Sequence, residues 1–241
     1  MKAMVLKQRA MISSEPLVCQ DVPDPEPGPH EILIKVHCCA ICRTDLHVIE
    51  GDLPAAKTPV IPGHQVVGSV IQTGADCQRF QIGDCVGIAW LSKTCGQCQF
   101  CQSGRENLCE QSLFTGYHAD GGFAELAVVH EEYAYAIPDV FSHLEATPLL
   151  CAGIIGYRAL SRSELQPGQR LGIYGFGSSA HVVIQIAQHR GCEVYVVTRG
   201  EKHRQLARSM GATWVGEYAE QMPKKVHSAI VFAPAGELVP P

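Results

Sequence analysis

Four cysteines close together in the sequence constrain this chain more than any other feature. Cys95, Cys98 and Cys101 are separated by two residues each, and Cys109 follows after a gap of seven residues. Thiolates two residues apart can bind one tetrahedral ion, because the turn between them directs both sulfurs to the same side. Four such ligands fill the coordination sphere of zinc and leave no position open for a substrate. We therefore predict a structural zinc site that braces this loop.

Three other interpretations of the cysteine cluster are open. The first is an iron–sulfur cluster, but the bacterial ferredoxin motif continues with a fourth cysteine after three residues and then a proline. Here the gap is seven residues and Glu110 follows. The second is a set of free thiols. The third is a zinc module that binds nucleic acid, but Arg105 is the one cation between residues 97 and 111, and phosphate contact needs more positive charge. Ligand softness and spacing favour structural zinc.

Composition and charge restrict the class of protein and the partners it can have. The chain has 241 residues, of which 46% are hydrophobic and 18% charged, as in an ordinary globular protein of one or two domains. A net charge of -5 without any Lys/Arg run argues against nucleic acid and anionic membranes as partners. The N-terminus lacks the apolar core of a signal peptide, and no stretch approaches the ~20 apolar residues that span a bilayer. We expect a cytoplasmic protein with small-molecule partners.

The twelve cysteines fit a reducing compartment, where clustered cysteines bind metal or do chemistry more often than they form disulfides. Six of them belong to no predicted site, and we interpret these as small buried apolar residues. They are Cys19, Cys38, Cys39, Cys77, Cys85 and Cys192.

The pattern of hydrophobic and turn-forming residues changes near residue 150. Residues 1–150 contain short β-branched runs, such as Ile32–Val36 and Val66–Ile71, broken by Pro and Gly clusters, which predicts an all-β, loop-rich domain. In residues 151–241 strands alternate with helices, which predicts βαβ units in a parallel sheet. The expected strands are 170–174, 193–198, 213–215 and 226–232, and the expected helices are 178–189 and 201–210. The predicted fold class is α/β plus β, a β-rich domain followed by part of a doubly wound domain.

A glycine-rich turn marks a dinucleotide site in the second domain. Gly175-Phe176-Gly177-Ser178-Ser179-Ala180 follows an apolar strand and opens a helix, which is the context that makes GxGxx[G/A] specific. The first glycine allows the tight turn and the second lets a pyrophosphate approach the backbone. The helix N-terminus offers free amides. We assign Gly175, Gly177, Ser178 and Ser179 to cofactor binding.

The end of the second strand of this domain bears on the choice between NAD and NADP. NAD-binding proteins usually carry an Asp or Glu there, which binds the adenosine ribose. This chain has Val197-Thr198-Arg199-Gly200 instead. Arg199, and Arg204 in the next helix, could bind a 2′-phosphate. We therefore prefer NADP over NAD, with Thr198, Arg199 and Arg204 in the site; the alternative is that Arg199 is a solvated loop residue.

A second set of metal-ligand types is scattered along the chain. Cys42, His64 and Cys151 stand far apart in sequence, and each taken alone is more often a core residue than a ligand. Taken together they supply three ligands and leave one coordination position open for chemistry, as in a catalytic zinc site.

Ordered motifs along essentially the whole chain resemble the zinc-containing alcohol dehydrogenases of the medium-chain dehydrogenase/reductase superfamily. They are Gly63-His64 with Gly68 and Gly74 downstream, the clustered cysteines, Gly83-Asp84 before Val86, Asp120-Gly121-Gly122-Phe123-Ala124-Glu125, and Cys151 before Ala152-Gly153. The resemblance implies a GroES-like catalytic domain in residues 1–150 and an NAD(P)-binding Rossmann domain in 151–241. It implies two zinc ions per chain, the catalytic one on Cys42, His64 and Cys151, and hydride transfer between an alcohol and NAD(P). Full-length relatives are homo-oligomeric.

The resemblance also assigns a path for the proton of the alcohol. Thr44 matches a hydroxyl that takes this proton and passes it through the nicotinamide ribose toward a histidine, which His47 matches. An imidazole titrates near neutral pH and can give the proton to solvent. Asp45 would orient the ring of His64 from behind. Without the resemblance, Thr44 would be interpreted as a helix cap and His47 as a solvated surface residue.

Two departures from the family pattern affect what we expect. The family commonly carries Glu directly after the zinc histidine, and this chain has Gln65. Relatives also continue beyond the point that matches Pro241, so we expect a C-terminally truncated chain whose strand 226–232 is an open edge. Such a chain would bind NADP weakly, be poorly active and aggregate.

Two alternatives to the alcohol dehydrogenase function stay open from the sequence. One is a non-catalytic fragment that keeps a zinc-stabilised scaffold. The other is a zinc-independent reductase of the same superfamily. A content of one zinc ion per chain rather than two would favour it. The particular alcohol is not predicted, because variable apolar side chains form such pockets.

Overall fold

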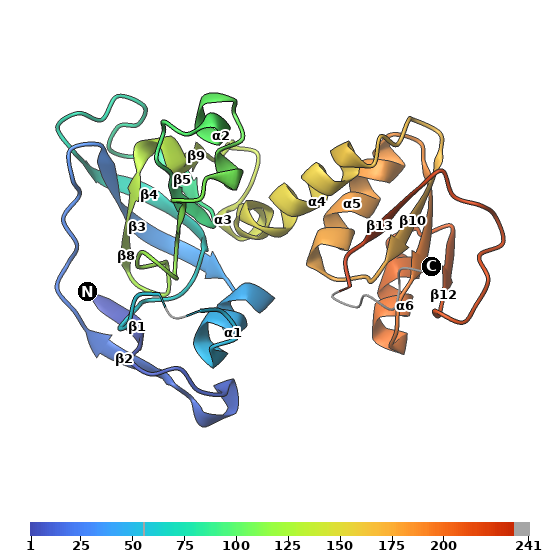
Figure 1. The fold of residues 1–241 in the computed structure, drawn as a ribbon, viewed down its shortest axis with the longest axis horizontal. Helices are drawn as coiled ribbons and strands as arrows, with labels where there is room; N and C mark the ends of the chain where they lie inside the picture. Colours follow the sequence, from blue (N-terminus) through green and yellow to red (C-terminus); the bar gives the residue numbers. More distant parts are fainter. Residues whose placement is uncertain (55, 234–241) are drawn as a thin grey trace. The chain divides into compact units, whose positions relative to one another are not determined.

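The computed structural model describes residues 1–54 and 56–233, and the chain divides after Leu150 into two compact units, Met1–Leu150 and Cys151–Pro241 (Figure 1). The last eight residues of the predicted second domain, 234–241, lie outside the described residues. Within the described ranges, no helix has both the length and the apolar character needed to cross a membrane.

The first unit is organised around a five-stranded antiparallel sheet in the order β8-β3-β4-β5-β9. Its strands are β3 Glu31–Ala40, β4 Gln65–Thr73, β5 Cys85–Ile88, β8 Leu126–His130 and β9 Ala134–Ala136. The two β-branched runs of the sequence lie inside β3 and β4. Ile32, Ile34, Val66 and Val70 form one buried cluster, because alternate residues of a strand point to the same face.

Two smaller ribbons complete the strands of this unit. β1 (Lys2–Leu6) pairs with β2 (Leu17–Asp21), and β6 (Leu91–Lys93) pairs with β7 (Leu113–Phe114). The β6–β7 ribbon holds the two ends of the segment that carries the four clustered cysteines. The predicted metal loop is therefore closed at its base by backbone pairing.

The first unit is not all β, and that prediction is wrong. Helix α1 (Arg43–Glu50) forms because Cys42 caps its N-terminus and Gly51 ends it with a φ of 90°. Two one-turn helices, α2 (Gln99–Gln102) and α3 (His143–Ala146), also occur. The 3₁₀ turns are η1 Ile12–Ser14, η2 Glu106–Leu108, η3 Glu131–Tyr133 and η4 Thr147–Leu150. Short capped helices lack the long apolar periodicity by which sequence patterns reveal a helix.

The second unit has a four-stranded parallel sheet in the order β12-β11-β10-β13. The strands are β10 Arg170–Tyr174, β11 Glu193–Val197, β12 Trp214–Gly216 and β13 Ser228–Val231, and the connecting helices are α5 Ser178–His189 and α6 Glu201–Ser209. Numbered within this unit, the strand order is 3-2-1-4, the order of the first four strands of a doubly wound sheet. The predicted fold class is confirmed, and each predicted element is found within two residues of its expected bounds.

Helix α4 (Ala152–Arg162) was not predicted. It packs along α5, beside which it lies in Figure 1. Gly156 allows this close approach, since a Cβ there would stand 2.9 Å from the carbonyl oxygen of Ser179. Two glycines in the segment weaken its helix propensity, so packing on α5 rather than local preference accounts for the helix.

The interpretation of the six unassigned cysteines as buried residues holds for Cys192 and fails for Cys19. Cys192 is 7% exposed in the core of the second unit, whereas Cys19 is exposed. Cys19 lies on β2, which belongs to a two-stranded ribbon that cannot cover both of its faces. The other four, Cys38, Cys39, Cys77 and Cys85, are partly buried.

Candidate functional site

Asp45 holds two parts of the first candidate site together. It lies in the first turn of α1, and its Oδ2 atom accepts the backbone N–H of Cys42 at 2.8 Å. Its Oδ1 atom is 2.9 Å from Nδ1 of His64, at the start of the segment that leads into β4. The residue is 2% exposed. Because Nδ1 of His64 is engaged by the carboxylate, Nε2 is the nitrogen left to face a metal.

Cys42, His64 and Cys151 come together at this point. Nε2 of His64 lies 3.4 Å from Sγ of Cys42, and the ligand atoms of all three residues lie within 4.8 Å of one another. Cys151 directly follows η4, the last turn of the first unit. A tetrahedral zinc ion with bonds of ~2.0–2.3 Å would hold its ligand atoms roughly 3.3–3.8 Å apart. Two thiols and one imidazole at these distances suit zinc, and three protein ligands leave a fourth position open.

The protonation of His64 is tied to this site. Burial acts to lower the pKa of the imidazole, but hydrogen bonds to Asp45 and Cys42 outweigh burial and raise the pKa to about 9. A metal binds the neutral ring, so metal binding at neutral pH releases a proton.

Gly63 sets the backbone path into His64. Its φ is +97°, and a Cβ at this position would lie 2.5 Å from the ring of Phe123 and 2.9 Å from Sγ of Cys39. Gln65, on the other side of His64, is buried, and its amide nitrogen donates to the carbonyl of Ala40 at 3.3 Å. A glutamate could not donate this hydrogen bond, so the departure from the family pattern at residue 65 has a local structural role.

The predicted proton path lies along the first turns of α1. The backbone N–H of Thr44 donates to Sγ of Cys42 at 3.3 Å, which places Thr44 beside the three ligands. His47 stands one turn further on, and its side chain is 38% exposed. Nδ1 of His47 lies 2.6 Å from Oδ2 of Asp52, a partner that was not predicted. The glycine at position 51, which ends the helix, is the sequence signal that could have placed Asp52 beside the last turn.

Trp90 is a second residue that the sequence did not single out. Its ring meets that of His64 edge to face, with centroids 5.1 Å apart and planes at 77°. It also stacks on Phe114 at 5.0 Å and on Tyr117 at 5.9 Å. Trp90 thus packs against the ring of His64, and its stacking on Phe114 and Tyr117 holds Trp90 in place. No local motif signals Trp90, because the contact joins segments that are distant in sequence.

The four clustered cysteines form the second candidate site. Their sulfurs lie within 4.8 Å of one another, with Sγ of Cys101 3.9 Å from Cys95 and 3.5 Å from Cys98. All four carry free thiols. The separations are near the roughly 3.8 Å expected for two sulfurs on one zinc ion. Among the described residues, two groups of possible metal ligands have their ligand atoms this close together: these four cysteines, and the set Cys42, His64 and Cys151.

Backbone amides stabilise thiolates in this cluster. The N–H of Cys98 donates to Sγ of Cys95 at 3.3 Å, and the N–H of Cys95 donates to Sγ of Cys109 at 3.5 Å. Hydrogen bonds from the amides of Gln97 and Cys98 lower the pKa of Cys95 to about 6. The loop is therefore prepared for the deprotonated form that a metal ligand requires.

The glycine-rich turn of the second unit has the geometry expected for a phosphate-binding turn. Gly175 has a φ of 90°, and a Cβ there would lie 2.8 Å from the backbone nitrogen of Ala233. Gly177 is exposed, and a Cβ on it would meet nothing within 4 Å, so its backbone is open to a ligand. No side chain caps the N-terminus of α5, which begins at Ser178. The exposed Ser178 and the half-buried Ser179 contribute the first amides of the helix.

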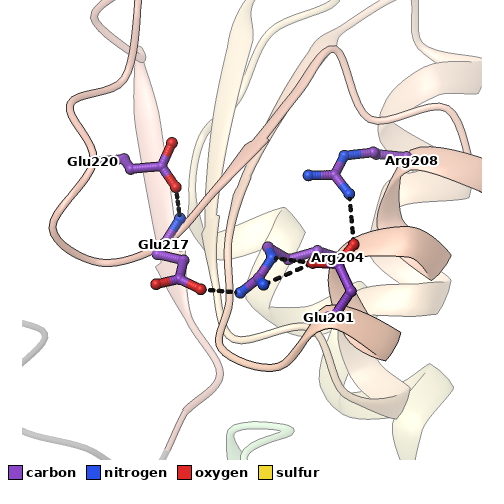
Figure 2. A network of polar contacts seen from close by, with 5 residues as sticks. All are labelled: Glu201, Arg204, Arg208, Glu217 and Glu220. Atoms are coloured by element: carbon purple, nitrogen blue, oxygen red, sulfur yellow. Dashed lines mark hydrogen bonds and ion pairs between the residues drawn. The ribbon is translucent and has the colours of Figure 1, made fainter.

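The two arginines assigned to a 2′-phosphate differ in their surroundings. Arg199 is exposed, next to the buried Thr198 at the end of β11. The side chain of Arg204 is only 15% exposed and is bound by Glu201 at 2.7 Å and by Glu217, as Figure 2 shows. Because two carboxylates already neutralise Arg204, Arg199 is the cation available to an anionic ligand.

The carboxylates around Arg204 belong to a larger network (Figure 2). Arg208 contacts Glu201 at 3.2 Å, and the backbone N–H of Glu217 donates to Glu220 at 2.9 Å. Nearby, Nδ1 of His203 lies 3.1 Å from the carbonyl oxygen of Phe176. The start of α6 is thereby connected both to the end of β12 and to the glycine-rich turn.

Comparison with known proteins gives the family. The family model "Alcohol dehydrogenase GroES-like domain" matches residues 28–139. "Probable alcohol dehydrogenase AdhA" of Mycobacterium tuberculosis (strain CDC 1551 / Oshkosh) is 53% identical over 222 residues, covering 90% of this chain. "Alcohol dehydrogenase" of Geobacillus stearothermophilus is 37% identical over 242 residues, covering 97% of this chain. This chain spans 64% of the length of the first relative and 71% of the second.

Solved structures agree with the sequence comparison. CAD from Helicobacter pylori complexed with NADP(H) superposes with a TM-score of 0.85 at 27% identity, over 97% of this chain and 70% of the other. A cobalt- and zinc-bound thermostable alcohol dehydrogenase from Pyrobaculum aerophilum gives a TM-score of 0.81 at 28% identity, over 90% and 66% of the two chains. The sequence, the fold and both comparisons lead to one assignment: the chain belongs to the zinc-containing alcohol dehydrogenases of the medium-chain dehydrogenase/reductase superfamily.

Proposed function

We propose that this protein is a zinc-dependent alcohol dehydrogenase, which transfers a hydride between an alcohol, or the corresponding aldehyde or ketone, and NAD(P). One observation carries the proposal. The ligand atoms of Cys42, His64 and Cys151 converge within 4.8 Å, with Asp45 on the far nitrogen of the imidazole. In this proposal residues 1–150 form the catalytic domain and residues 151–241 the nucleotide-binding domain.

The residues around the three-ligand site divide the work of the reaction. A zinc ion held by Cys42, His64 and Cys151 would supply a Lewis acid that polarises the substrate oxygen. The two thiolates would reduce its net charge, and Asp45 keeps His64 in the tautomer that presents Nε2. The hydroxyl of Thr44 would take the alcohol proton, and the half-exposed His47 would release it to solvent.

A second zinc ion would be held by Cys95, Cys98, Cys101 and Cys109, giving two per chain. Four sulfurs complete a tetrahedron, so this ion would brace the loop and take no part in the chemistry. The free thiols and the amides that already donate to them support this assignment.

We propose NAD(P) as the hydride carrier, with NADP preferred over NAD. The turn at Gly175 and Gly177 and the uncapped start of α5 support pyrophosphate binding. No carboxylate stands in Val197-Thr198-Arg199-Gly200, and Arg199 is exposed. The Helicobacter relative was solved with NADP(H). We place Thr198 and Arg199 against the adenosine end of the cofactor and Arg204 at its edge, where the two glutamates hold it.

The partners that we propose are a small alcohol and its aldehyde or ketone. We also propose a cytoplasmic location, because a reducing compartment keeps the four clustered cysteines available to metal. Homo-oligomerisation stays a prediction.

One assay tests metal, cofactor and reaction together. Zinc per chain and the rate of alcohol oxidation are measured with NAD and with NADP, before and after treatment with a chelator. We expect two zinc ions per chain, faster turnover with NADP, and loss of turnover with the chelator. One zinc per chain with turnover that resists chelation would favour the zinc-independent reductase. Two zinc ions without nucleotide binding or turnover would favour the non-catalytic scaffold.

A further inference from the structure

A hydroxyl lies between the cysteine loop and the five-stranded sheet. Oγ1 of Thr94 is 3.3 Å from Sγ of Cys101 and 2.6 Å from the hydroxyl of Tyr133. Thr94 follows β6 and directly precedes Cys95. Tyr133 ends η3, and its ring packs against the buried core of the sheet. The hydrogen-bonded series Tyr133–Thr94–Cys101 therefore connects a sulfur of the cluster to the buried core of the five-stranded sheet.

When Cys101 is a thiolate, the chemistry of the three groups fixes which of them donates each hydrogen bond. A thiolate only accepts hydrogen bonds, so the single hydroxyl proton of Thr94 must point to Sγ. Oγ1 of Thr94 then accepts the proton of the Tyr133 hydroxyl. Two hydrogen bonds in the same direction polarise each other, so Tyr133 strengthens the bond that Thr94 donates.

The charge of the loop gives this hydrogen bond a function. Four thiolates around a divalent ion would carry a net charge of about −2. Arg105 is the cation in this loop, but its guanidinium donates to Ser103 at 3.0 Å and lies over the ring of Phe100 at 5.5 Å. Hydrogen-bond donors must therefore offset the negative charge on the sulfurs. Amides do so for Cys95 and Cys109, and the Thr94 hydroxyl, 3.3 Å from Sγ of Cys101, would do so for a Cys101 thiolate.

We propose that Thr94 is a positioning residue of the four-cysteine zinc site, supported by Tyr133. Its hydroxyl orients Cys101 and reduces the charge on that sulfur, which tightens zinc binding. This inference rests on the zinc that we propose for the four cysteines. It adds two residues, outside the ligand set, that set how firmly the metal is held.

Zinc retention is the first test. Hydrogen bonds to metal ligands typically contribute ~10–100-fold to metal affinity. We expect Thr94→Val to raise the dissociation constant of zinc at the cysteines by about tenfold or more, and to speed zinc loss to a chelator. Thr94→Ser, which keeps the hydroxyl, should restore the wild-type behaviour. Tyr133→Phe should act in the same direction as Thr94→Val but more weakly.

The matched control for Thr94→Val is Thr115→Val. The Oγ1 atom of Thr115 is buried and has no hydrogen-bond partner among the described residues. Removing it changes a threonine to valine in the same domain without touching the cluster. Tyr135→Phe, at a residue that is 42% exposed, is the control for Tyr133→Phe. Neither control should change zinc retention.

Cobalt spectroscopy separates a positioning role from a merely structural one. A hydrogen bond lowers the energy of the sulfur lone pair, so its loss moves the sulfur-to-cobalt charge-transfer band to longer wavelength. We expect this shift in Thr94→Val after replacement of zinc by Co²⁺, and its reversal in Thr94→Ser. A bond that only fastened the loop to the sheet would change the melting temperature and leave the band in place.

The outcomes distinguish the two proposals. If the wild-type protein binds zinc at the four cysteines but Thr94→Val matches it in zinc loss and in the cobalt band, the role of Thr94 is overturned and the zinc site stands. If metal analysis finds no zinc or cobalt at these cysteines in the wild-type protein, the structural zinc itself is overturned, and the role of Thr94 with it.

Discussion

Nδ1 of His64 lies 2.9 Å from Oδ1 of Asp45, and the two side chains are 1% and 2% exposed. The other oxygen of the same carboxylate accepts the backbone N–H of Cys42. One buried side chain therefore positions two of the three proposed ligands of the catalytic metal. It acts on one through the ring and on the other through the start of helix α1.

Asp45→Asn should empty the three-ligand site selectively. An amide is a weaker acceptor than a carboxylate and no longer favours the tautomer that binds metal through Nε2, so zinc affinity there should fall by ~10–100-fold. Zinc per chain after dialysis against a mild chelator should drop from two to one, because the four cysteines are untouched. Asp76→Asn, at an aspartate whose side chain is 59% exposed, is the control and should retain both ions. Equal zinc content in the two variants would contradict the role of Asp45.

Arg199→Gln should weaken NADP binding and leave NAD binding nearly unchanged. A hydrogen bond to a charged group contributes ~1.5–3 kcal/mol, so the dissociation constant of NADP should rise by about tenfold or more. Arg204→Gln should instead lower the melting temperature, because it leaves Glu201 and Glu217 without their shared partner. Calorimetric titration with both nucleotides checks the pair of variants. A selective loss of NADP affinity in Arg204→Gln alone would reverse the assignment.

Alkylation of metal-free protein should depend on pH in a way that differs between cysteines. The pKa of Cys95 is lowered to about 6, so its thiolate and its reaction with iodoacetamide should be nearly complete well above pH 6, about half lost at pH 6 and further reduced below it. Burial raises the pKa of Cys39 to about 12, so this residue should stay unmodified at pH 8. Mass spectrometry of peptides measures both. Equal labelling of the two residues at pH 7 would contradict the prediction.

Glu131 should make stability depend on pH. Burial acts to raise the pKa of its carboxyl group, but the amides of Arg79 and Gln78 outweigh burial and lower it. A carboxyl group with a lowered pKa stabilises the fold above its ordinary value of ~4.3, and this contribution is lost as the pH falls through the folded-state pKa. Glu131→Gln should cost about 1–3 kcal/mol at pH 7 and less at pH 3. Urea unfolding of both proteins at the two pH values gives the difference, and a pH-independent difference would argue against this role.

The sequence predicted the second unit better than the first, for physical reasons. Buried parallel strands alternate with helices at regular spacing, so β10, α5, β11 and α6 were recognisable from hydrophobic pattern alone. Helix α1 was missed because two local caps define it, at Cys42 and Gly51, and its eight residues are too few for a clear periodicity. Helix α4 was missed because its glycines are explained only by the neighbouring α5.

In the candidate sites, too, some residues were predictable from the sequence and others were not. The ligand residues were predictable because their types are those that zinc requires and because the resemblance placed them. Their supporting partners were not: Asp52, Trp90 and Thr94 act through contacts with His47, His64 and Cys101. The contact between Trp90 and His64 joins segments brought together only by folding, and no local pattern encodes it. The ion pair between Arg204 and Glu217 was likewise not predictable, and it makes Arg204 less available to a 2′-phosphate than the sequence suggests.

The tight packing at Gly63 restricts which variants of this protein can arise. Any side chain there would have to displace the ring of Phe123 or the sulfur of Cys39, in a backbone conformation that already disfavours every residue except glycine. Gly83 has a similar φ of +100°, but a Cβ there meets nothing within 4 Å. In a saturation library selected for zinc retention, position 63 should return glycine almost exclusively, whereas position 83 should also admit asparagine and aspartate. The residue that leads the chain into its metal ligand is thus among the least evolvable in the first unit.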